Sequence, residues 1–96
     1  MTPRLHPEAQ AELAAAALYY DGECPGLGEE FLDAGESSLS AIAFDPARHR
    51  QFDEQHRKIN LHRFPYALIY KATPQAVVVK TVMHLHRQPG YWKRRQ

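Results

Sequence analysis

Cysteine is almost absent from this chain, because Cys24 is the only one among its 96 residues. One cysteine forms no internal disulfide, so we expect a protein of a reducing compartment, the cytoplasm. No apolar run approaches the roughly 20 residues of a membrane-spanning helix, so no membrane association is expected. Residues 4–12 are polar and do not resemble a signal peptide. The length predicts a single domain over residues 1–96.

Basic residues are almost missing from the first half of the chain. Residues 1–47 contain Arg4 as their only arginine or lysine against nine acidic residues, whereas residues 48–96 contain eleven basic residues and two acidic ones. The halves carry net charges of −8 and +9, which together give the overall +1. A basic half favours a polyanionic partner, either nucleic acid or an acidic protein segment. The alternative is that the two halves neutralise each other within the fold.

Two helices are predicted in the acidic half. Pro7 suits the first turn of a helix, and the alanine-rich stretch that follows has an apolar face at helical spacing, which predicts a helix over Pro7–Asp21. A second apolar face predicts a helix over Gly28–Phe44 that ends before Pro46. Gly35 lies on that face, and close contact with the first helix would explain it. Together they predict an antiparallel helical hairpin.

Three strands are predicted in the basic half. Alternation indicates a strand over Arg57–Leu61, and β-branched and aromatic runs indicate strands over Ala67–Ala72 and Val77–His84. The last two are joined by a short turn and predict a β-hairpin. Residues 4–6 could form an edge strand, and residues 47–55 are interpreted as a loop. The expected fold class is α+β, a helical hairpin packed on a small, twisted antiparallel β-sheet.

The last predicted strand ends in a polar, basic and aromatic cluster. His84 could transfer a proton near neutral pH, or it could be a structural histidine at the end of a strand. Arg87 could bind an anion, or it could pair with the acidic helices. His84 and His86 lie on one side of the strand, but without a nearby cysteine or carboxylate pattern we expect no metal site.

Other side chains of the basic half allow two interpretations. Arg57, Lys58 and Arg63 could contact phosphates, or they could form a solvated basic face. The aromatic residues of the predicted helix ends and strands are interpreted as core residues rather than as base-stacking platforms. They are Tyr19, Tyr20, Tyr66, Tyr70 and Trp92.

An ordered set of features over nearly the whole chain resembles the toxins of the RelE/ParE superfamily of type II toxin–antitoxin systems. The features are Tyr19-Tyr20, Gly26-Leu27-Gly28, Asp45-Pro46, Arg57 with Leu61, Phe64-Pro65-Tyr66 with Tyr70, and finally His84, Arg87, Pro89, Tyr91-Trp92 and Arg95. The resemblance implies a helical hairpin on a twisted sheet, no cofactor, and a cognate antitoxin protein that wraps and neutralises the toxin.

The resemblance allows two kinds of activity. RelE-like members cut mRNA in the ribosomal A site by metal-independent chemistry, which needs cations beside the phosphate and groups that move protons. Lys58 matches a basic position of that pattern, and Tyr91 matches its C-terminal aromatic position. Ala67 and Leu85, however, stand at or near positions where nucleases carry arginines. ParE-like members instead poison DNA gyrase and have no nuclease function.

Three hypotheses follow. The first is a ribosome-dependent endoribonuclease with His84, Arg87 and Tyr91 as catalytic residues and with Arg57, Lys58 and Arg63 as nucleic-acid contacts. The second is a gyrase poison without enzymatic activity, favoured by Ala67. The third is a non-toxic module that only binds an antitoxin.

Overall fold

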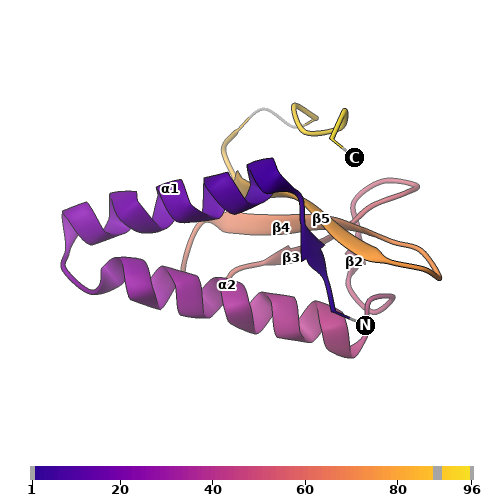
Figure 1. Cartoon of the computed structure of the whole chain (residues 1–96), viewed down its shortest axis with the longest axis horizontal. Coiled ribbons are helices and arrows are strands. Elements are labelled where there is room, and N and C mark those ends of the chain that lie inside the picture. The colour runs from indigo at the N-terminus through magenta and orange to yellow at the C-terminus, as the bar shows by residue number, and fades with distance from the viewer. Residues whose placement is uncertain (1, 88–89, 96) are drawn as a thin grey trace.

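The computed structural model describes residues 2–87 and 90–95, and it places a helical hairpin against a five-stranded sheet (Figure 1). The hairpin consists of α1 (Pro7–Glu23) and α2 (Leu27–Phe44). The strand order across the sheet is β1-β5-β4-β3-β2. The strands are β1 (Arg4–Leu5), β2 (Arg50–Gln51), β3 (Arg57–Asn60), β4 (Tyr66–Ala72) and β5 (Val77–His84). The predicted α+β class is confirmed.

The predicted β-hairpin is confirmed in the pairing of its strands. β4 and β5 run antiparallel, with Ile69 opposite Thr81 and a bulge beside Ile69. The sheet is nevertheless mixed rather than wholly antiparallel, because β1 pairs in parallel with β5 at residues 78 and 79. β2 lies within the predicted loop of residues 47–55. A two-residue polar strand has too few positions to show an alternating pattern, so its pairing with β3 is not evident from sequence.

Glycines allow the two helices to pack closely. A Cβ atom at Gly28 would overlap the carbonyl oxygen of Ala17 and lie 2.9 Å from the Cβ of Asp21, and one at Gly35 would lie 3.2 Å from Leu13. The Asp21 carboxylate accepts hydrogen bonds from the backbone N–H groups of Gly26 (3.0 Å) and Gly28 (3.3 Å). It thereby satisfies donors at the start of α2 that have no partner within the helix.

The helix-side core lies between the hairpin and the sheet. Phe31 is completely buried, and its ring lies 5.1 to 5.3 Å from those of Tyr20, Phe64 and Tyr66. The prediction that Tyr19 is also a core residue is wrong, because Tyr19 is 62% exposed. Adjacent helical residues point about 100° apart, so Tyr19 and Tyr20 cannot both face the sheet. The buried members of this core are Ala9, Ala16, Ala17, Phe31, Ile42, Leu61, Phe64, Leu68, Tyr70, Val77, Val79 and Val82.

A second, smaller cluster involves the C-terminal segment, residues 90–95. Trp92 is fully buried against Ile69 and Met83, and Phe52 packs at the margin of the cluster. The His56 ring meets Trp92 edge-on at 4.7 Å. We call Ile69, Met83 and Trp92, with Phe52 and Tyr91 beside them, the far-side cluster. Among the residues described, no helix is both long and apolar enough to cross a bilayer.

Candidate functional site

The three predicted catalytic residues line one cleft. His84 comes from the end of β5, Arg87 follows it, and Tyr91 comes from the C-terminal segment. The cleft has a volume of about 250 Å³ and is completed by α1 and β4. Its lining residues are Glu12, Ala15, Ala16, Tyr19, Tyr66, Val82, His84, Arg87 and Tyr91.

Neighbouring groups fix the orientation of the His84 ring. Its Nδ1 accepts a hydrogen bond from the backbone N–H of His86 at 3.1 Å. The ring also meets the rings of Tyr66 and His86 edge-to-face, at centroid distances of 5.0 and 5.2 Å. In the neutral imidazole, the proton is therefore on Nε2. No cluster of three or more potential metal ligands occurs in residues 2–87 and 90–95.

Arg87 is exposed beside the cleft and stacks on Tyr91. Its guanidinium carbon lies 3.9 Å from the centroid of the Tyr91 ring, within the range of a cation–π contact. Within the described residues, no carboxylate pairs with Arg87. The side chain is exposed, and its planar fork of N–H donors suits a carboxylate or phosphate.

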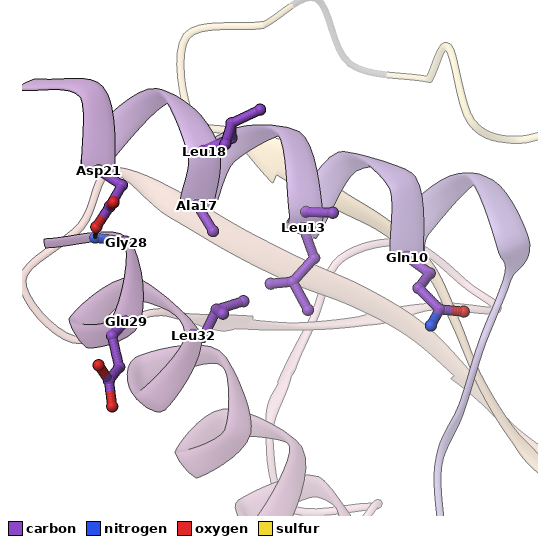
Figure 2. Close-up of a pocket in the computed structure, with 9 residues that line it drawn as sticks. Gln10, Leu13, Ala17, Leu18, Asp21, Gly28, Glu29 and Leu32 are labelled. Atoms are coloured by element: carbon purple, nitrogen blue, oxygen red, sulfur yellow. Dashed lines mark hydrogen bonds between the residues drawn. The ribbon is translucent and has the colours of Figure 1, made fainter. Parts of the chain in front are cut away.

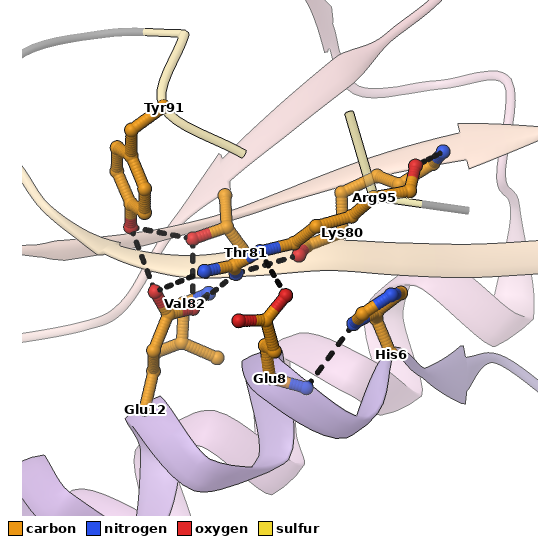
Figure 3. Close-up of polar contacts among 8 residues, drawn as sticks. All are labelled: His6, Glu8, Glu12, Lys80, Thr81, Val82, Tyr91 and Arg95. Carbon is orange, nitrogen blue, oxygen red and sulfur yellow. Dashed lines mark hydrogen bonds and ion pairs between the residues drawn. The ribbon is translucent and has the colours of Figure 1, made fainter. Parts of the chain in front are cut away.

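The Tyr91 hydroxyl is held within a polar cluster rather than facing the cleft freely (Figure 3). It lies 2.7 Å from the Thr81 hydroxyl and 3.0 Å from Oε2 of Glu12. Burial raises the pKa of Tyr91, and the nearby Glu12 carboxylate also favours its neutral form. Tyr91 thus supports Arg87 with its ring while its hydroxyl is occupied.

Glu12 is at the centre of this cluster, although it is not among the site residues predicted from the sequence. Its carboxylate receives Arg95 in a bidentate pair, with distances of 2.8 and 3.1 Å. Partial burial alone would raise the pKa of Glu12, but hydrogen bonds from Arg95, Thr81, Val82 and Tyr91 hold it below its ordinary value. Nothing in the helical pattern distinguishes Glu12, because its partners are 69 to 83 positions away in the sequence.

The three predicted nucleic-acid contacts do not share one surface, because the adjacent residues Arg57 and Lys58 project from opposite faces of β3. Arg57 donates to the backbone carbonyl of His49 at 2.8 Å. Lys58 lies opposite Ile69, a member of the far-side cluster, and therefore projects from the sheet face opposite the helices. Arg63 pairs with Glu30 at 3.1 Å. None of the three lines the cleft, so the structure does not place Lys58 with Arg87 and Tyr91.

The outer side of the helical hairpin carries a separate apolar groove of about 490 Å³ (Figure 2). Leu18 is 76% exposed there and Leu32 is 42% exposed, and Asp21 and Glu29 lie at the margins. Residues 7–44 contain no arginine or lysine. This surface is therefore both apolar and acidic, in contrast to the cleft with Arg87.

Comparison with known proteins identifies the family. Residues 4–89 match the model of a family described as the ParE toxin of the type II toxin–antitoxin system parDE. The chain belongs to the ParE toxin family. A solved structure, the chromosomal ParDE TA system from P. aeruginosa, superposes with a TM-score of 0.75 at 14% identity. The match covers 90% of this chain and 97% of that one.

This family assignment confirms the superfamily predicted from the sequence, and the structural match confirms the fold. No curated protein sequence matches the chain. As a ParE-family toxin, the protein has an antitoxin as its expected partner.

The central strand of this ParE-family toxin has no space for a catalytic cation at Ala67. Ala67 is fully buried between Asn60 and Met83 on the neighbouring strands. An arginine in its place would require a buried guanidinium or a displaced strand. The packing of the sheet therefore requires a small residue at position 67, where RelE-like nucleases carry an arginine.

Proposed function

We propose that this protein is the toxin of a type II toxin–antitoxin pair and that it inhibits growth by binding DNA gyrase rather than by cutting RNA. Membership of the ParE family supports this proposal. The main observation in its favour is that the Tyr91 hydroxyl at the cleft is already engaged in hydrogen bonds with Glu12 and Thr81. A toxin with this target would act in the cytoplasm.

The groups at the cleft are too few for metal-independent RNA cleavage. That reaction needs cations beside the scissile phosphate, a group that activates the 2′-hydroxyl and a group that protonates the leaving oxygen. Among the described lining residues, Arg87 is the cation not already paired with a carboxylate, and His84 is the residue suited to proton transfer near neutral pH. Ala67 is buried and Lys58 lies on the opposite face of the sheet.

The same groups suit recognition of a protein surface. Arginine and tyrosine are among the residues that most often dominate binding at protein interfaces. Arg87 rests on Tyr91, Tyr19 is 62% exposed, and Tyr66 and His84 form the adjoining wall. This cleft offers a cationic fork surrounded by aromatic rings, which fits an acidic and partly apolar segment of the target.

A supercoiling assay with purified gyrase tests the proposal. The wild type should inhibit the reaction, and Arg87→Ala should raise the half-inhibitory concentration by about tenfold or more, the scale expected for a central interface arginine. Arg48→Ala is the matched control, because Arg48 is also exposed but lies in the loop after α2. Its half-inhibitory concentration should remain that of the wild type.

Ribosome-dependent RNA cleavage is the second candidate, favoured by the shared position of His84 and Arg87 in the cleft. Primer extension on ribosome-bound mRNA separates the two activities. A-site cuts by the wild type that decrease roughly 100-fold in Arg87→Ala would establish the nuclease and refute the gyrase proposal. If the wild type neither cuts RNA nor inhibits gyrase, the third hypothesis, a non-toxic antitoxin-binding module, replaces both.

A further inference from the structure

Side chains, rather than a neighbouring strand, cover part of the edge of β5. β1 pairs with β5 only at Val78 and Val79, so the edge beyond them has no strand partner within the described residues. Arg95 donates to the backbone carbonyl of Lys80 at 3.0 Å, and Glu12 accepts from the backbone N–H of Val82 at 3.1 Å. The Glu12–Arg95 pair thus forms hydrogen bonds with backbone groups at the edge of β5, as a neighbouring strand would (Figure 3).

Glu12 connects three parts of the molecule that are distant in sequence. Five atoms that can donate hydrogen bonds lie within 3.1 Å of its two oxygens, and they come from β5 and the C-terminal segment. The side chain itself belongs to α1 and is only 18% exposed. The donors are the Thr81 hydroxyl, the Val82 backbone N–H, the Tyr91 hydroxyl and two nitrogens of Arg95.

The position of Arg87 depends on this arrangement. Arg87 stacks on the Tyr91 ring, and that ring is held by its hydroxyl at Glu12 and Thr81. If the C-terminal segment moved, the guanidinium would lose the surface on which it rests. Glu12 therefore acts on the cleft through Tyr91 in addition to lining it.

We infer that Glu12 is a positioning residue of the toxin: it holds the C-terminal segment against β5 and so presents Arg87 at the mouth of the cleft. The effect on activity rests on the proposed function, in which Arg87 contacts the target. The effect on the C-terminal segment is independent of that function and is measured separately.

Glu12→Gln is the informative variant, and Glu8→Gln is its matched control. Both remove one negative charge from the first turns of α1. Glu8 also approaches Arg95, at 3.4 Å, but it is 66% exposed and accepts none of the hydrogen bonds from the edge of β5. A general effect of charge near Arg95 would therefore appear in both variants, whereas positioning appears only in Glu12→Gln.

Trp92 reports the position of the C-terminal segment. It is the only tryptophan of the chain and is fully buried beside Tyr91. In Glu12→Gln we expect red-shifted emission and stronger quenching by acrylamide, with the far-ultraviolet circular dichroism unchanged. The half-inhibitory concentration against gyrase should rise by about tenfold, since charge-assisted hydrogen bonds are lost. Glu8→Gln should match the wild type in every measurement.

If the Trp92 emission of Glu12→Gln is the same as that of the wild type, the inference is overturned, whether or not inhibition of gyrase is lost. A red shift with undiminished inhibition overturns the link between the segment and the cleft. If the wild type does not inhibit gyrase, the proposed function fails, and Trp92 quenching still decides whether Glu12 holds the segment. If Glu12→Gln does not fold, Thr81→Val replaces it, because this substitution removes one donor to Glu12 without changing side-chain size. The inference then requires a smaller red shift of the Trp92 emission in Thr81→Val.

Discussion

The two faces of the sheet are covered by different kinds of packing. On the helix side, twelve buried hydrophobic residues form one continuous core. Within it, the Phe31 ring packs against three other aromatic rings. On the far side, three buried residues form the cluster, and the C-terminal segment is attached through Trp92, Tyr91 and Arg95. The first face distributes its stabilisation over many contacts, whereas the second depends on a few.

This difference places one wall of the cleft, formed by Tyr91, in the more easily perturbed part of the molecule. Tyr91 belongs to the C-terminal segment and packs beside the far-side cluster, and Arg87 stacks on its ring, whereas His84 ends β5. Segments with few buried apolar contacts open locally at less cost than the whole domain. Substitutions on the far side should therefore affect activity more than stability, and those on the helix side should do the reverse.

Phe31→Ala should have the largest effect on stability. Removing a fully buried ring from the helix-side core costs about 3–5 kcal/mol in the free energy of unfolding. Leu32→Ala is the matched control, because Leu32 is the next residue but is 42% exposed, and its loss should be much smaller. Urea denaturation measures both. Equal losses would show that the helix-side core is not the main source of stability.

Trp92→Ala should cost less stability than Phe31→Ala, although tryptophan is the larger side chain. The loss should remain below about 3 kcal/mol, because the C-terminal segment can detach while the helix-side core stays folded. Urea denaturation gives the stability, and the gyrase assay should show a marked loss of inhibition. A loss of stability as large as that of Phe31→Ala would contradict the contrast between the two faces.

Gly28→Ala should be destabilising by about 1–3 kcal/mol, since the added methyl group overlaps the carbonyl oxygen of Ala17. Gly22→Ala is its control. No atom lies within 4 Å of a Cβ atom at Gly22, which is inside α1, so this substitution should stabilise the protein by about 0.4–1 kcal/mol. Thermal unfolding measures both variants. A neutral Gly28→Ala would show that the two helices can move apart at little cost.

Glu12 should give the far side a measurable sensitivity to acid, the smallest of these effects. The pKa of Glu12 is lowered in the folded protein, so its contribution is complete above the ordinary glutamate pKa of about 4.3 and is lost as the pH falls through the lowered value. Glu12→Gln removes this titrating group. Unfolding free energies measured between about pH 5 and pH 3 should therefore decrease less steeply in Glu12→Gln than in the wild type.

Asp53 remains in both proteins as the control for this measurement. Burial by itself would raise the pKa of Asp53, but hydrogen bonds from Gln55 and His56 lower it, so a residual acid dependence should persist in Glu12→Gln. Identical slopes in the two proteins would show that Glu12 contributes no stability through its charge.

Local patterns in the sequence determined the helices, the central strands and the family. Pro7 begins α1, and the backbone restriction before Pro46 fits the end of α2 at Phe44. β-branched residues in Val77–His84 predicted β5 because such side chains suit a pleated surface. His84, Arg87 and Tyr91 were close enough in sequence, at the end of one strand, to be predicted as neighbours. Each of these features is encoded within about ten residues of its position.

Only the tertiary structure decided which of these residues act together and what surrounds them. It turned Tyr20 toward the core and Tyr19 toward solvent, and it kept Lys58 out of the cleft by placing it on the sheet face opposite the helices. It also brought Glu12 to donors that follow it by 69 to 83 residues. Such contacts leave no local pattern, because a carboxylate near the apolar face of a helix looks the same in sequence whether it meets water or an arginine from the other end of the chain.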